Sequence, residues 1–189
     1  KSLSMLWFTQ KVLRKIPGNW TFVMVTDRSE LDSQLHGEFA DAGAIRRSAL
    51  VQLSRRDFAS PELVEKLTGQ GYADDAVQAV VEELVAEHLI DDSRYAANYV
   101  SWHASRGQGP VRIRQDLIAV GLPGELVAQA LEAGPDFAAL CRQTRARRFG
   151  AELPQEWKER ARQARFLQYR GFSADHIRSA FGPDFDPEE

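Results

Sequence analysis

The chain has 189 residues and a formal net charge of −3, from 24 basic and 27 acidic residues. Hydrophobic residues make up 43% and charged residues 27%, a balance typical of a globular protein with one domain or a short array of small ones. The single cysteine, Cys141, excludes an internal disulfide framework and a cysteine-rich zinc site, and we expect it to be a small core residue. It fits a reducing cytosol, and no apolar run reaches membrane-spanning length, so we expect a cytoplasmic protein without membrane attachment.

Residues 1–25 are basic and apolar, but polar residues interrupt any signal-peptide core. Two interpretations stay open. In one, the natural start is Met24 and the preceding residues are upstream sequence. In the other, apolar residues form a short amphipathic arm: Leu3, Leu6, Trp7, Val12 and Leu13. Residues 26–41 are polar and acidic, and we expect a linker or a frayed helix there.

From Ala42 onward the spacing of apolar residues predicts helices almost throughout. The first predicted helix ends near Arg55, the second begins at Ser60 with a proline in its first turn and ends at Gly71, and the third begins near Asp74. The residues expected to face the core are Ile45, Ala49, Leu50 and Leu53, then Leu63, Val64 and Leu67, then Val77, Val80, Val81, Leu84 and Val85.

The stretch Leu89–Leu122 predicts two further helices joined by a turn. Asp92 or Ser93 is the expected N-cap of the first, in which Tyr95, Tyr99 and Trp102 recur at helical spacing and are more typical of core than of a base-stacking surface. Gly107, Gly109 and Pro110 interrupt this helix. The second helix is expected to direct Ile113, Leu117 and Ile118 inward and Arg112 and Arg114 outward, and to end at Gly121 in the left-handed conformation.

Three glycines lie 50 residues apart, at Gly71, Gly121 and Gly171, and the sequences around them are alike. A leucine precedes each by four positions, an apolar residue follows each directly, and an acidic residue follows each by four. This repeat predicts an all-α protein, an elongated tandem array of three three-helix repeats. The repeats are expected at residues 42–90, 91–133 and 134–183, followed by a frayed acidic tail at 184–189.

Charge is unevenly distributed along the chain. Residues 62–94 hold nine acidic and two basic residues, a net of −7, whereas residues 142–170 hold nine basic and three acidic residues, a net of +6. The basic region indicates a polyanionic partner, although solvated helix faces also carry such runs. Its arginines include Arg145 and Arg148, whose planar guanidinium groups suit phosphates and carboxylates.

We find no Walker loop, dinucleotide-binding glycine loop, metalloprotease helix or nucleophile elbow in the sequence. The best metal-site candidate is His88 with Asp91 and Asp92, but a helix cap explains the two aspartates more simply. We therefore expect no enzyme, no cofactor and no metal.

The sequence resembles the RecX family, bacterial regulators of the RecA recombinase. The resemblance lies in Leu89–Leu122, with its Leu–x–Asp–Asp–Ser–Arg–aromatic start, its Gly–x–Gly–Pro turn and its Ile–Arg–Gln–x–Leu helix. Supporting matches are Arg55 with Ser60–Leu67, and Arg165–Ile177. One departure is His103, where relatives often carry arginine. The likeness spans about residues 45–181, and residues 1–25 lie outside it.

The resemblance implies an elongated array of three repeats that binds RecA along its filament groove on single-stranded DNA. It further implies inhibition of the recombinase, ATPase and co-protease activities, and hence a role in recombination, DNA repair and the SOS response. Direct DNA binding is the alternative primary activity, with double-stranded DNA left open as a ligand. We expect a monomer. The candidate contact residues, six from the resemblance and two from the charge run, are Arg94, Arg106, Arg112, Arg114, Arg145, Arg148, Arg165 and Arg170.

Overall fold

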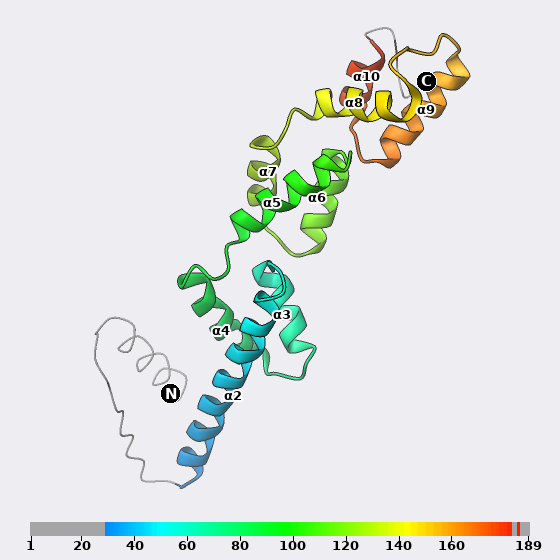
Figure 1. Cartoon of the computed structure of the whole chain (residues 1–189). Coiled ribbons are helices and arrows are strands. Elements are labelled where there is room, and N and C mark those ends of the chain that lie inside the picture. The colour runs from blue at the N-terminus through cyan, green and yellow to red at the C-terminus, as the bar shows by residue number, and fades with distance from the viewer. Residues whose placement is uncertain (1–28, 183–184, 186–189) are drawn as a thin grey trace. The chain divides into compact units, whose positions relative to one another are not determined.

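The computed structural model of the chain describes residues 29–182 and 185, with side chains described from Asp41 onward. All regular secondary structure in these residues is α-helical, and no strand is found among them (Figure 1). The helices are α2 (Ser29–Leu53), α3 (Ser60–Thr68), α4 (Asp74–Ala86), α5 (Asp92–Ser105), α6 (Pro110–Ala119), α7 (Gly124–Glu132), α8 (Phe137–Phe149), α9 (Trp157–Tyr169) and α10 (Ala174–Phe181). The predicted all-α array of three-helix repeats is confirmed, and its elongation stays a prediction.

The chain divides into two compact units, which are described separately. The first contains the chain up to Arg56 together with Val64–Ala86. The second contains Asp57–Leu63 and the chain from Glu87 onward, and so holds the second and third repeats. The first turn of α3 thus clusters with the second unit, and the remainder of α3 with the first. The predicted repeat boundaries stay predictions.

In the first unit, α2 and α4 share a core around the buried residues Ile45, Ala49 and Val77. Leu50 and Val85 were expected to face this core, but 38% and 41% of their surfaces are exposed. Each follows a buried residue by one position, and one step along a helix turns a side chain by about 100° out of the apolar stripe. Helix α2 begins at Ser29, so the expected linker or frayed helix is helical from that residue. Residues 1–25 lie outside the described residues.

The three repeat glycines all have positive φ, +95° at Gly71, +95° at Gly121 and +88° at Gly171. Each ends the second helix of its repeat, as predicted, because a side chain would be strained in this conformation. The leucines four positions earlier, Leu67, Leu117 and Leu167, are fully buried. The sequence repeat is therefore a repeat of helix ends and of the core residues beside them.

The second repeat packs α5, α6 and α7 around Val100, Leu117 and Val127. The N-cap of α5 is Asp91, whose carboxylate accepts a hydrogen bond from the Arg94 backbone N–H at 2.9 Å. The predicted caps, Asp92 and Ser93, lie one and two positions too late.

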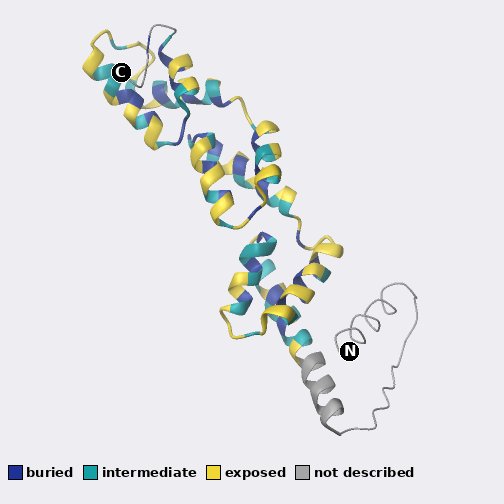
Figure 2. Ribbon diagram, turned by 180° about the vertical axis from the view of Figure 1, so that it is seen from behind, coloured by how far each residue is buried: buried dark blue, intermediate teal, exposed yellow. Residues whose placement is uncertain are grey.

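Two other expectations for the second repeat need correction. Asp92 does not cap α5. Its carboxylate instead accepts a hydrogen bond from the Ser60 N–H, at the first residue of α3, at 2.7 Å. Ile118 was expected inside but is 46% exposed, whereas Ile113 and Leu117 are fully buried. Helix α6 therefore buries a narrow stripe, and Ile118 lies at its edge. Buried and exposed residues alternate in this way along the helices of the described part of the chain (Figure 2).

The third repeat packs α8, α9 and α10 around Cys141, Leu167 and Ile177. Cys141 is fully buried, and its burial raises the pKa of the thiol to about 12, which fits the expected role as a small core residue. Phe185 is 2% exposed and its ring lies 4.6 Å from that of Phe181, between centroids. The tail expected to be frayed is therefore anchored at Phe185, and its other residues lie outside the described residues.

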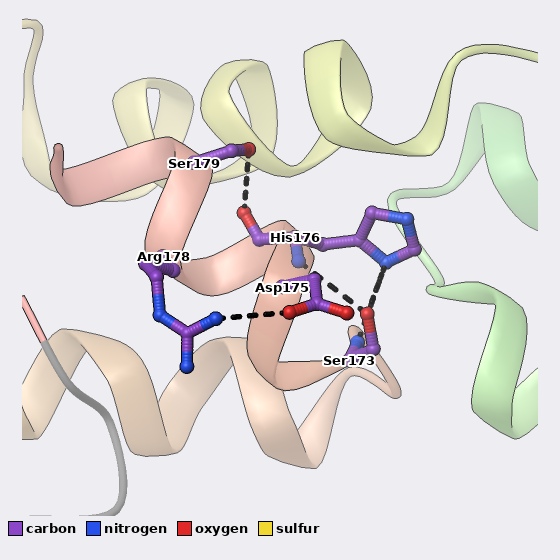
Figure 3. Close-up of polar contacts among 5 residues, drawn as sticks. All are labelled: Ser173, Asp175, His176, Arg178 and Ser179. Carbon is purple, nitrogen blue, oxygen red and sulfur yellow. Dashed lines mark hydrogen bonds and ion pairs between the residues drawn. The ribbon is translucent and has the colours of Figure 1, made fainter. Parts of the chain in front are cut away.

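A polar cluster fixes the N-terminus of α10 (Figure 3). The Ser173 side chain accepts from the His176 backbone N–H at 3.4 Å, while His176 Nδ1 lies 2.8 Å from Ser173 Oγ and accepts from the Ser173 N–H at 3.4 Å. Burial of the imidazole lowers the pKa of His176, with opposing contributions from Asp175 and Asp136. This reciprocal cap requires a lone pair on Nδ1, and so a neutral ring protonated on Nε2.

Candidate functional site

The arginines divide into those that pair with carboxylates of this chain and those available for a partner. Arg46 pairs with Glu83 at 4.0 Å, Arg162 with Glu159 at 2.9 Å and Arg178 with Asp175 at 3.0 Å. By contrast, several predicted contact residues are exposed and have no carboxylate within 4 Å among the side chains described: Arg94, Arg106, Arg112, Arg114, Arg148 and Arg165. Unpaired guanidinium groups retain their full capacity to bind an external oxyanion.

Arg145 is an exception among the predicted contact residues. Its side chain is 4% exposed, and its guanidinium donates to the backbone oxygens of Ala151 at 2.8 Å and Glu152 at 3.0 Å, and to Gln163 Oε1 at 3.3 Å. Burial lowers the pKa of this guanidinium. Arg145 therefore ties the loop after α8 to α9, and it is not exposed to contact a partner, contrary to the prediction. The sequence placed it in a basic run without showing that it faces the core.

Three predicted arginines from two repeats converge on one hollow of about 430 Å³ in the second unit. Arg106 comes from the end of α5, Arg148 from α8 and Arg170 from the end of α9. The hollow is also lined by Arg147, which belongs to the same basic run but was not among the predicted contact residues, together with Thr144, Phe166, Ser105 and Gly107. We call it the joint hollow. The remaining candidates, Arg94, Arg112, Arg114 and Arg165, do not line it.

Stacking and a backbone contact orient two of these arginines. The Arg106 guanidinium carbon lies 3.6 Å from the centroid of the Trp102 ring, within range of a cation–π interaction. Arg170 donates from Nη1 to the Arg106 carbonyl oxygen at 3.3 Å, and its guanidinium lies 5.3 Å from the Phe166 centroid. Arg106 and Arg170 are 64 positions apart, so only the tertiary fold brings them together.

The aromatic stripe of α5 is divided between core and surface. Tyr95 and Tyr99 are partly buried against the core of the second repeat, but Trp102 is 50% exposed. Tyr99 stacks on His103 with centroids 3.9 Å apart and donates to Asp116 at 3.4 Å. Burial, followed by the charge of Asp116, raises the pKa of Tyr99 to about 12. The stripe was expected to be core, which is wrong for Trp102.

His103 is held by contacts on both sides of its ring. It stacks on Tyr99 and meets the Trp102 ring edge to face, and its Nδ1 forms a hydrogen bond with Gln108 Oε1. Gln108 belongs to the turn between α5 and α6. His103 therefore fixes that turn directly beside Arg106.

The arrangement suits binding of anions rather than covalent chemistry. Four guanidinium groups around one hollow make a strongly positive surface with many hydrogen-bond donors. Among the described residues, no group of three or more histidine, cysteine, aspartate or glutamate side chains is placed to hold a metal ion. A search of the same residues for a membrane-spanning helix finds none of sufficient length and apolarity.

Two family models match the repeats described above. The model of the RecX second three-helix domain matches residues 91–131, and that of the RecX third three-helix domain matches residues 136–181. A further model, SWI2/SNF2 ATPase, matches residues 1–101. The sequence contains no G-x-x-x-x-G-K-[ST] phosphate loop, and the regular secondary structure in the described part of residues 1–101 is helical.

Individual relatives agree with the two repeat models. The chain is 43% identical over 142 residues to "Regulatory protein RecX" of Halorhodospira halophila, covering 75% of this chain and 88% of that protein. It is 42% identical over 135 residues to the protein of the same name from Pseudomonas syringae pv. tomato, covering 71% and 87%. The structure titled "Crystal structure of RecX from Lactobacillus salivarius" superposes with a TM-score of 0.66 at 22% identity, covering 75% and 94%. This last likeness concerns the fold alone.

Proposed function

The chain belongs to the RecX family of regulatory proteins, and from this premise we propose that it is a negative modulator of RecA. It binds the RecA–DNA filament and inhibits the recombinase, ATPase and co-protease activities, thereby regulating recombination and DNA repair. It acts by binding and carries no catalytic activity of its own. RecA and DNA are its partners, and it works as a cytoplasmic monomer.

The observation that carries this proposal is family membership across two repeats, supported by the unpaired arginines in the same repeats. A nucleoprotein filament presents DNA phosphates and protein carboxylates, and both are oxyanions that arginine binds with paired hydrogen bonds. The proposed contact residues are Arg94, Arg106, Arg112, Arg114, Arg148, Arg165 and Arg170, with Arg147 added.

DNA-dependent ATP hydrolysis by the cognate RecA, measured while this protein is titrated, tests the proposal. Inhibition that becomes complete at or below equimolar ratio is the expected result. An unchanged rate at several-fold molar excess would contradict the proposal. Imaging of the filaments in the same samples separates loss of filaments from inhibition of intact ones.

The alternative is that DNA binding is the primary activity and that the protein competes with RecA for DNA. The exposed Trp102–Arg106 pair favours this alternative, because aromatic faces stack on unpaired bases. Charge reversal of Arg112 and Arg114 distinguishes the two. If Arg112→Glu with Arg114→Glu leaves DNA affinity intact but stops inhibition of RecA, the protein contact is primary.

Salt dependence and a charge-matched control complete this comparison. Direct DNA binding through several phosphates weakens steeply between low and physiological salt. The control carries the same charge change in the first unit, Arg47→Glu with Arg55→Glu, at two exposed residues outside the proposed surface. Equal loss of DNA binding in both double variants would indicate an effect of net charge alone.

A further inference from the structure

The second and third repeats meet in a backbone-to-backbone joint. The Gly109 N–H donates to the Arg170 carbonyl oxygen at 2.8 Å, and the Val111 N–H donates to the Gly171 carbonyl oxygen at 3.0 Å. Gly109 is the N-cap of α6, and Arg170 is the C-cap of α9. Helix ends leave donors unsatisfied at the N-terminus and acceptors unsatisfied at the C-terminus, so each end supplies what the other lacks.

Two glycines make this close approach possible. A Cβ atom on Gly109 would lie 2.2 Å from the Gly171 oxygen, and a Cβ atom on Gly171 would lie 2.4 Å from the Arg112 Cβ. Gly109 has φ −87° and ψ 164°, a conformation open to any residue. Glycine at position 109 is therefore needed for space alone, and the joint closes only without that side chain.

The joint hollow lies beside these hydrogen bonds. Arg106 precedes Gly109 by three positions, Arg170 directly precedes Gly171, and the Arg170 side chain donates to the Arg106 carbonyl oxygen. One side of the hollow is formed by Ser105, Arg106 and Gly107 of the second repeat. The other side is formed by residues of α8 and α9 in the third repeat. The hydrogen bonds of the joint therefore hold together the two segments that line the hollow.

The charges around the hollow are not balanced from within. Among the described side chains, neither Arg147 nor Arg148 has a hydrogen-bond or ion-pair partner. Arg106 contacts the Trp102 ring, and the described contacts of the Arg170 guanidinium are a neutral carbonyl and the Phe166 ring. Four like charges around one hollow repel one another, and an anion of high charge density would offset this repulsion.

We propose that the joint hollow is a binding site for phosphate groups, and that Gly109 and Gly171 are positioning residues for it. A phosphate presents several acceptor oxygens, which matches donors arriving from the α5, α8 and α9 segments better than a planar carboxylate does. The Thr144 hydroxyl adds a neutral donor to the same wall. This inference rests on the proposed function and deepens it, because the arginines of the joint hollow are among the proposed contact residues. Binding is measured on this chain alone, so its failure is distinguishable from a failure to inhibit RecA.

Calorimetric titration of the full chain tests the site, with inorganic pyrophosphate as one probe and an oligodeoxythymidylate of about 12 nucleotides as the other. Arg147→Gln and Arg148→Gln are each expected to weaken binding roughly tenfold, because each removes charge-assisted hydrogen bonds. Arg142→Gln, at an exposed residue of α8 outside the hollow, is the matched control and should change affinity less than about twofold.

The two probes identify the source of the phosphate. If pyrophosphate displaces the oligonucleotide, and both weaken in the two hollow variants, the site serves phosphates of a nucleic-acid strand. If only pyrophosphate binding weakens, the site takes a free phosphate compound. If Arg147→Gln and Arg148→Gln match Arg142→Gln with both probes, the proposal is overturned, whatever happens to RecA inhibition.

Gly109→Ala tests the positioning role. The added methyl group collides with the Gly171 oxygen, so we expect roughly tenfold weaker binding of the better probe. Gly124→Ala is the control, since the nearest atom to its Cβ would be Ile118 Cδ1 at 4.0 Å. Unchanged affinity in a folded Gly109→Ala protein would refute the positioning role. If that variant does not fold, the arginine variants still decide whether the hollow binds phosphate.

Discussion

Pro61 lies directly against Gly121, so closely that a Cβ atom on the glycine would stand 2.8 Å from the Pro61 Cβ. A similar relationship recurs at Gly171, 50 positions after Gly121, which faces Arg112 in the first turn of α6, one position beyond the counterpart of Pro61. In both cases the first turn of the second helix of one repeat contacts the glycine that ends the second helix of the next repeat. The cap glycines therefore serve twice, by ending a helix and by giving the preceding repeat a place to pack.

The two joints differ at one position. Gly109 donates its N–H across the second joint, whereas the corresponding residue 50 positions earlier, Ala59, is fully buried in the core of the second repeat. A methyl group is thus accommodated at the first joint and excluded at the second. The joint hollow lies at the contact between the second and third repeats, which is the closer of the two.

Arg145→Ala is expected to destabilise the second unit by about 2–4 kcal/mol, because it leaves the carbonyl groups of Ala151 and Glu152 without their donor. Urea denaturation followed by circular dichroism measures the change. Arg142→Ala, at an exposed residue on the same helix, should stay within about 0.5 kcal/mol. If Arg145→Ala were as stable as this control, the assignment of Arg145 to the fold would be wrong.

Asp91→Ala should destabilise by about 1 kcal/mol through loss of the α5 N-cap bond to the Arg94 N–H. Ser93→Ala is the informative comparison, since Ser93 was one of the two caps predicted from the sequence, and this change is expected to cost a few tenths of a kcal/mol at most. Thermal unfolding of the two variants under identical conditions measures the difference. A larger loss for Ser93→Ala would contradict the observed cap.

His176 should make the stability of the third repeat depend on pH. Burial depresses its folded-state pKa below the ordinary value of 6.5, so the unfolded chain binds a proton more readily than the folded one. The contribution is fully present above about pH 6.5 and is lost as the pH falls from there toward the folded-state pKa. Protonation also removes the Nδ1 lone pair that accepts from the Ser173 N–H.

Urea midpoints for the wild type and His176→Gln, compared between neutral pH and pH 5, check this dependence. The wild type should lose more stability than the variant over that interval. Asp136 has a pKa lowered chiefly by the hydrogen bond from the Ala139 N–H, so its own contribution is lost only at more acidic pH. Equal slopes in the two proteins would exclude His176 as the responsible group.

Trp102→Leu should lower affinity for single-stranded DNA roughly tenfold while changing stability by less than about 1 kcal/mol, if the exposed ring stacks on a base. Fluorescence anisotropy with a labelled oligonucleotide measures the affinity. Tyr169→Leu, an aromatic residue that is 78% exposed and does not line the hollow, serves as the control. Full retention of DNA affinity in Trp102→Leu would leave Trp102 as a support for Arg106 only.

The helices, their glycine ends and the family resemblance could be predicted from the sequence because they depend on local properties. Apolar spacing specifies a helix face, and a left-handed helix end requires glycine at one position, as at Gly121. An apolar helix face and a glycine helix end form in any environment that supplies a core. The errors at Leu50, Val85 and Ile118 are at the edges of such faces, where burial depends on the neighbouring helix.

The use of each arginine and aromatic side chain was decided only by the tertiary structure. Arg145 and Arg147 stand two positions apart in one basic run, yet one is enclosed by the loop after α8 and the other lines the hollow. Trp102 fits the apolar spacing of α5, but half of its surface is exposed among the residues that the structure describes. Burial and partnership depend on residues remote in the chain, as with Arg106 and Arg170, and helical spacing carries no information about such pairs.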